Sequence, residues 1–136
     1  MRARRGIAVL AAAAAVAAPA VALASAPPTG HYVGNDGVAF HLRLSEHGNP
    51  VVEDARYHAH SSFHRTHLYE ARTFKTCARA RINSIQFNEY CINGEFGTHD
   101  HAWGAVEVFH GVHHNGNGHV AAKPYETHHW SAALAG

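Results

Sequence analysis

The chain has 136 residues, which is enough for one small domain. It contains 11 Lys and Arg and 10 Asp and Glu residues, and the basic ones are scattered, which argues against a nucleic-acid-binding surface. The composition is unusual in one respect, because 15 residues are histidines and six of these lie between Thr98 and His119.

The first 24 residues have the features of a secretory signal peptide. Three arginines precede an Ala-, Val- and Leu-rich run from Gly6 to Ala24, which ends in an A-x-A cleavage site. We therefore expect residues 1–24 to be removed, residues 25–29 to form a short extended leader, and the protein to be secreted, with no stable membrane insertion after cleavage. The alternative is an uncleaved N-terminal anchor.

Removal of the signal peptide changes the charge of the chain. Residues 25–136 hold eight Lys and Arg against ten Asp and Glu, so the net charge is −2 with neutral histidines. All 15 histidines remain, and their full protonation would raise the charge to +13. Because histidine titrates near pH ~6.5, the charge should change sign between neutral and mildly acidic conditions.

The chain has two cysteines, Cys77 and Cys91. In an oxidising compartment we expect them to form one disulfide, closing a loop of about 15 residues and adding about 3 kcal/mol to stability. The alternative is a metal site with two thiolates. That alternative requires a C-x2-C-like proximity, which a gap of 13 residues does not supply.

Alternating apolar and polar residues predict the first strands. The domain is expected to begin at Gly30, and Val38–Leu44 should be a half-buried antiparallel strand. The loop Ser45–Pro50 should lead into a second strand over Val51–His60. On the first of these strands the residues expected to face the core are Val38, Phe40, Leu42 and Leu44.

The middle of the chain is harder to interpret, because Ser61–Thr76 shows no clear period. Strands are predicted over Cys77–Ile82 and Ile85–Ile92. Asn93-Gly94 is the strongest short hairpin signal, and a return strand should begin at Glu95.

The last third of the chain again alternates. In Trp103–Val112 the period places His110 with the apolar valines, at or near the core. Asn115–Gly118 should be a turn, and His119–Ala122 and His128–Leu134 should close the sheet. With no convincing helix, residues 30–136 are predicted to form an all-β domain, a small antiparallel meander that folds as a sandwich or a barrel.

The order of several motifs resembles that of small secreted all-β domains of actinobacteria and other Gram-positive bacteria. These motifs are G-x-Y-x-G at Gly30–Gly34, the strand Val38–Leu42, Gly94-Glu95-Phe96, and a closing W-x-A at Trp130–Ala132. The resemblance implies a secreted β-domain of uncharacterised function and no catalytic residue. The many histidines depart from the pattern.

Two His-x-His pairs are candidate transition-metal ligands. They are His99/His101, with Asp100 between them, and His58/His60. On a strand such residues share one face and lie roughly 6.5–7 Å apart, so both imidazoles can converge on one ion. Neutral imidazole suits Zn, Cu and Ni. For each histidine the alternative is a solvated surface side chain.

Three hypotheses for function follow. The first is a secreted non-enzymatic binding module for an unknown extracellular ligand, with a histidine-rich surface that chelates Zn, Cu or Ni. The second is pH-dependent binding to anionic cell-wall polymers or polysaccharides without metal. The third is a metal-dependent extracellular hydrolase, which is disfavoured because the chain contains no recognised catalytic motif.

Overall fold

The computed structural model describes residues 26–113 and 124–135, and this part of the chain consists of β-strands and their connections. The strands are β1 (Gly30–Gly34), β2 (Val38–Leu44), β3 (Pro50–Tyr57), β4 (Thr66–His67), β5 (Thr73–Arg81), β6 (Gln86–Phe96), β7 (His101–His113) and β8 (Glu126–Ala135). No helix in the described residues is long and apolar enough to cross a membrane.

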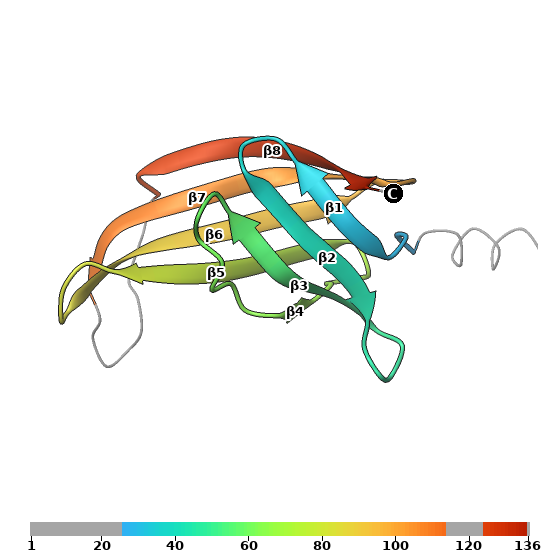
Figure 1. Ribbon diagram of the computed structural model, residues 1–136, viewed down its shortest axis with the longest axis horizontal. Helices are drawn as coiled ribbons and strands as arrows, with labels where there is room; N and C mark the ends of the chain where they lie inside the picture. The colour runs from blue at the N-terminus through green and yellow to red at the C-terminus, as the bar shows by residue number, and fades with distance from the viewer. Residues whose placement is uncertain (1–25, 114–123, 136) are drawn as a thin grey trace, which may run out of the picture.

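All eight strands belong to one antiparallel sheet, in the spatial order β4-β3-β2-β1-β8-β7-β6-β5. Strands that follow each other in the chain pair with each other, except β4 and β5, and β1 also pairs with β8. The sheet curls until its end strands β4 and β5 approach each other, which gives a nearly closed barrel (Figure 1). The prediction of an all-β antiparallel meander is confirmed, and its single sheet curls into a nearly closed barrel rather than splitting into a sandwich.

Aromatic side chains fill the barrel. Phe40 is fully buried, and its ring centroid lies 5.2 Å from that of Phe74 and 5.8 Å from those of Phe96 and Trp130. The alternation of β2 accounts for this position, since Val38 and Leu42 are also buried as predicted.

Leu44 breaks the predicted pattern of β2, because it is 61% exposed. The reason is the length of the neighbouring strand. β1 pairs with β2 only as far as Leu42, so Leu44 extends beyond the barrel wall into the β2–β3 hairpin.

The connection from β3 to β5, which includes β4, covers the line along which the two ends of the sheet approach each other, called here the seam of the barrel. β4 pairs with β3 only at Val51 and Val52. Phe63 packs into the core, and the Thr76 hydroxyl of β5 donates a hydrogen bond to the His64 carbonyl at 2.5 Å. This segment had no sequence period because tertiary contacts, rather than a regular strand, determine its path.

The hairpin predicted at Asn93-Gly94 is wrong. Both residues lie inside β6, where they pair with Lys75 and Phe74 of β5 on one side and with β7 on the other. The chain turns instead at residues 82–85 and 97–100. Gly94 is required for packing, because a Cβ there would collide with the Phe74 ring.

A β-bulge in β7 overturns the expected position of His110. The β6–β7 register shifts between Phe87 and Glu89, and Gly111 adopts a φ of 61°. His110 is therefore exposed, with its ring stacked on Tyr125 at 4.2 Å. Simple alternation failed here because a bulge adds one residue and changes the side that each following residue faces.

The predicted disulfide between Cys77 and Cys91 is confirmed. The two cysteines are directly opposed on β5 and β6, with their Cα atoms 4.1 Å apart. The 13-residue gap is closed by the hairpin, so the sequence gap was a poor guide to the distance between the thiols.

Several expectations lie outside the described residues. These are the signal peptide over residues 1–24, the turn Asn115–Gly118 and the strand His119–Ala122.

Candidate functional site

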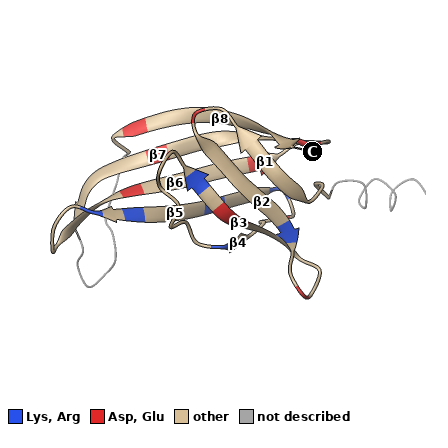
Figure 2. Cartoon of the chain, viewed as in Figure 1, with Lys and Arg blue, Asp and Glu red and all other residues tan. Residues whose placement is uncertain are grey.

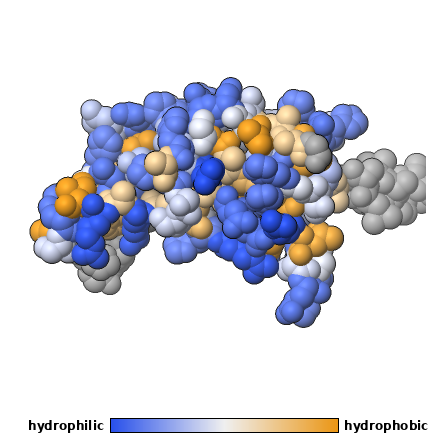
Figure 3. All heavy atoms as spheres, in the orientation of Figure 1, coloured by the Kyte–Doolittle hydropathy of each residue, from blue (hydrophilic) through white to orange (hydrophobic). Residues whose placement is uncertain are grey.

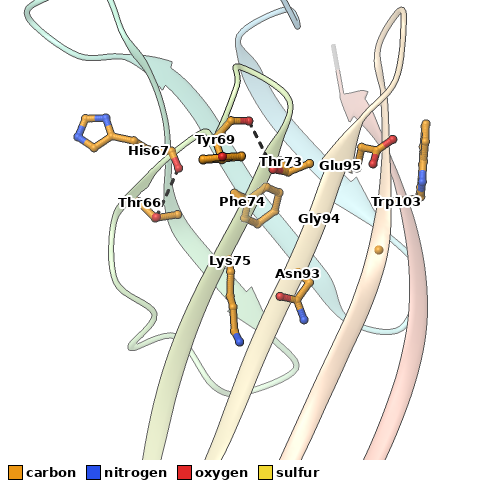
Figure 4. A pocket seen from close by; sticks show the side chains of 11 residues that line it. Thr66, His67, Tyr69, Thr73, Phe74, Lys75, Asn93, Gly94, Glu95 and Trp103 are labelled. Carbon is orange, nitrogen blue, oxygen red and sulfur yellow. Dashed lines mark hydrogen bonds between the residues drawn. The ribbon is translucent and has the colours of Figure 1, made fainter.

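A groove of about 620 Å³ crosses the outer side of β5, β6 and β7 near one end of the barrel. Figure 4 shows Tyr69 and Trp103 on opposite sides of the groove, with β5 and β6 between them. The residues that line it are Thr66, His67, Tyr69, Thr73, Phe74, Lys75, Asn93, Gly94, Glu95, Trp103 and Gly104.

Trp103 forms one wall of the groove and is 46% exposed. Its ring packs over Gly97, because a Cβ on Gly97 would lie 2.7 Å from the indole. Because Gly97 has no side chain, one side of the indole can pack against its backbone, while the rest of the indole faces solvent.

Tyr69 forms the opposite wall and is 73% exposed. Its backbone is fixed by a tight turn, in which its carbonyl accepts hydrogen bonds from the amides of Arg72 at 3.0 Å and Thr73 at 3.1 Å. Arg72 ties this turn to β6, since its guanidinium donates to the Phe96 carbonyl at 3.0 Å. An exposed aromatic ring is thus held on a well-anchored backbone.

Polar side chains lie between the two aromatic walls. Lys75, Asn93 and Glu95 point outward from strands whose alternate residues are buried. The Asn93 amide donates to Glu107 at 2.7 Å, which fixes its orientation and leaves its carbonyl oxygen as an acceptor. Together these groups offer both donors and acceptors of hydrogen bonds.

On the face of the molecule that Figure 3 shows, the described apolar residues form small, separate patches rather than one broad apolar surface. Charges of both signs are interspersed along the strands (Figure 2). One example is Arg79 of β5, whose Nε lies 3.2 Å from Oε2 of Glu89 on β6.

The first predicted histidine pair lies at the start of β7. His99 belongs to the preceding loop and His101 is the first residue of the strand, and both are exposed. Asp100 lies between them, with Oδ1 3.3 Å from Nδ1 of His101. The pair is accessible to an ion from solvent.

The second predicted pair, His58 and His60, is not on a strand. β3 ends at Tyr57, and His58 has a φ of 53°. The His58 ring packs against Tyr57 at 4.5 Å, whereas the His60 ring stacks on Tyr90 at 4.0 Å. Each imidazole therefore has its own aromatic neighbour.

Two further histidines stack on each other outside the barrel. The rings of His31 and His41 lie 4.4 Å apart on β1 and β2. Burial lowers the pKa of His41, and the neighbouring His31 and Arg43 lower it further, although Asp54 opposes them. This position is consistent with the predicted outward face of β2.

Within residues 26–113 and 124–135, one group of three potential ligands brings its ligand atoms within 4.8 Å of one another, and it is Cys77, Glu89 and Cys91. No histidine belongs to it. Metal binding by His99, His101, His58 and His60 therefore stays a prediction, because none of the described histidines belongs to such a three-ligand group. No sequence motif singled out Glu89, which reaches the two cysteines through strand pairing.

Comparisons with family models, with curated proteins and with solved structures gave no significant match. The resemblance to secreted domains of Gram-positive bacteria therefore stays a prediction.

Proposed function

We propose that the chain is a secreted, non-enzymatic binding module whose ligand is a polysaccharide. The observation that carries this proposal is the groove with exposed aromatic rings on both walls, Trp103 and Tyr69. A sugar ring has apolar C–H faces and a rim of hydroxyls, so it suits a site that combines aromatic surfaces with hydrogen-bonding side chains.

The dimensions and polarity of the groove support this ligand class. A volume of about 620 Å³ lies within the range of about 300–1,000 Å³ that is usual for small-ligand sites. Lys75, Asn93 and Glu95 supply donors and acceptors for hydroxyl groups. The groove is open to solvent rather than enclosed, so a polymer longer than the groove is not confined by it.

Affinity electrophoresis and fluorescence titration against a panel of soluble neutral polysaccharides test the proposal. We expect at least one polymer to bind, with a change in the emission of Trp103, since Trp130 is only 3% exposed. Trp103→Ala and Tyr69→Ala should each weaken binding about tenfold or more, which corresponds to about 1.4 kcal/mol.

Tyr125→Ala is the matched control, because Tyr125 is 68% exposed but does not line the groove. It should leave polysaccharide binding unchanged. Failure of the whole panel to bind, or equal losses in Tyr125→Ala and Trp103→Ala, would contradict the proposal.

A second candidate function is transition-metal chelation at His99 and His101. It is supported by the accessibility of both imidazoles and by the Asp100 carboxylate between them, which is 55% exposed. Zn, Cu or Ni would bind to neutral imidazoles, and binding would weaken at acidic pH because protons compete for the nitrogen ligands.

A further inference from the structure

The outer face of the β5–β6 hairpin carries two cysteines and a carboxylate side by side. Cys77 and Cys91 are opposed across the two strands, and Glu89 precedes Cys91 by two residues on the same face. The two sulfur atoms and a Glu89 carboxylate oxygen all lie within 4.8 Å of one another. Glu89 is 1% exposed and Cys91 2% exposed, so this group is largely removed from water.

The charge balance of this group depends on the disulfide. In the oxidised chain the sulfurs are neutral, and the Glu89 carboxylate is paired with the Arg79 guanidinium at 3.2 Å. Reduction and ionisation of the thiols would add two negative charges beside Glu89. A divalent cation bound between the two thiolates and the Glu89 carboxylate would offset this added negative charge.

We infer that the reduced chain binds one divalent Zn²⁺-like ion through Cys77, Cys91 and Glu89. Thiolate and carboxylate are both established zinc ligands, at about 2.3 Å for sulfur and about 2.0–2.2 Å for oxygen. Three protein ligands leave a fourth tetrahedral position, which water would occupy. The disulfide therefore closes the site, and reduction opens it.

The reaction balances with a dithiol as reductant. The dithiol transfers two electrons and two protons to the Cys77–Cys91 bond, which breaks, and the dithiol becomes a cyclic disulfide. The metal ion then displaces both thiol protons, which are released to solvent, and accepts one carboxylate oxygen from Glu89. For tetrahedral coordination the distance between the two sulfur atoms must increase to about 3.8 Å, and rotation of the cysteine side chains can supply this change.

Cobalt(II) is the probe that tests this site, because its thiolate complexes show charge-transfer absorption in the near ultraviolet and imidazole complexes do not. The full-length secreted chain is reduced with a dithiol, freed of reductant without oxygen, and titrated with Co²⁺. We expect one equivalent to give the thiolate band, and Zn²⁺ to abolish it. The oxidised chain should give no such band, whatever its histidines bind.

Two carboxylate variants distinguish a metal ligand from a neighbouring carboxylate that does not bind the ion. Glu89→Gln should weaken Co²⁺ binding to the reduced chain about tenfold or more. Glu107→Gln is the matched control, since Glu107 lies opposite Cys91 on β7 and is held by Asn93, yet does not belong to the ligand group. It should change the affinity by less than about threefold, and Cys77→Ser should abolish the thiolate band.

Absence of the thiolate band in the reduced wild-type chain would overturn the inference, as would equal effects of Glu89→Gln and Glu107→Gln. Circular dichroism is recorded in parallel. If the reduced chain is unfolded and Zn²⁺ does not restore the β-sheet signal, the site does not form and the inference is also overturned. These outcomes are independent of polysaccharide binding, which is measured with the oxidised chain.

Discussion

Burial in the barrel alters the chemistry of Tyr32. Its side chain is fully buried, and its hydroxyl donates a hydrogen bond to the Pro28 carbonyl at 2.7 Å. Burial, and to a smaller extent the nearby Asp100 carboxylate, raise the pKa of Tyr32 from 10.0 to about 12. The folded state therefore favours the neutral phenol more strongly than the unfolded chain does.

The sign of the resulting pH dependence follows from linkage. Because the folded pKa is the higher one, the contribution of Tyr32 is fully present below pH 10 and is lost as the pH rises from 10 toward 12. Tyr32→Phe should remove this loss and should cost about 1 kcal/mol at neutral pH, through the missing hydrogen bond. Urea unfolding at a series of alkaline pH values measures both effects.

Tyr57 is a second tyrosine that contributes to the dependence of stability on alkaline pH. Burial also raises its pKa, with smaller contributions from Asp36, Glu126 and Tyr90, so some alkaline destabilisation should persist in Tyr32→Phe. The double variant with Tyr57→Phe should be flatter still between pH 10 and 12. An unchanged profile in both variants would contradict the assignment to Tyr32.

The histidine pair at the start of β7 gives a second prediction for individual residues. If His99 and His101 chelate a metal, calorimetry of the untagged chain should give stoichiometric Zn²⁺ or Cu²⁺ binding at about pH 7.5, and this binding should vanish at about pH 5.5. The double variant His99→Ala/His101→Ala should lose it. The matched control is His58→Ala/His60→Ala, whose imidazoles pack against different tyrosines.

Weak binding at many sites, unaffected by either double variant, would contradict a dedicated site at His99 and His101. It would instead reflect the number of histidines alone, since the chain carries 15 of them.

At the level of strands, the sequence predicted those elements whose environment is regular. β2 has one face in the core and one in solvent along most of its length, so its alternation was informative. The turn predicted at Asn93-Gly94 was wrong because residue types that favour a hairpin turn also occur inside strands, where neighbouring side chains leave little space. Gly94 lies in β6 because the Phe74 ring occupies the space of a side chain.

The seam between β4 and β5 depends on one segment, and Phe63 is its anchor. The side chain is 9% exposed and packs in the core, while the adjacent His64 carbonyl accepts the Thr76 hydroxyl. Phe63→Ala should lower the free energy of unfolding by about 3 kcal/mol, the usual cost of removing a buried phenyl ring. Amide exchange should accelerate first in β5, whose outer edge this segment covers.

Tyr69→Ala provides the control for the seam, because Tyr69 lies in the same connection but is 73% exposed. It should change the free energy of unfolding by less than about 0.5 kcal/mol. Faster exchange spread evenly over all strands in Phe63→Ala would show that the segment supports the whole barrel rather than its seam.

For the molecule as a whole, the fold class was predictable, whereas the candidate site was not. Alternation and turns are local, and they were enough to indicate an antiparallel meander. The groove joins Tyr69, Asn93 and Trp103 from three segments, which the pairing of β5 with β6 and of β6 with β7 brings together. Glu89 was missed for the same reason, since it reaches the disulfide only through the pairing of β5 with β6.

The total charge gives the last prediction, because it belongs to no single site. Residues 25–136 carry eight Lys and Arg, ten Asp and Glu, and 15 histidines, so protonation should convert a weakly acidic surface into a strongly basic one. We expect dextran sulfate to bind at about pH 5 and not at about pH 7.5, with an affinity that falls steeply as salt is added.

Neutral dextran controls for the polymer backbone and should show no such change with pH. Trp103→Ala should leave the binding of dextran sulfate unchanged, because the attraction comes from histidines distributed over the described surface rather than from the groove. Equal binding at both pH values would contradict charge reversal. Loss of binding in Trp103→Ala would instead place the polyanion in the groove and join the two binding modes into one.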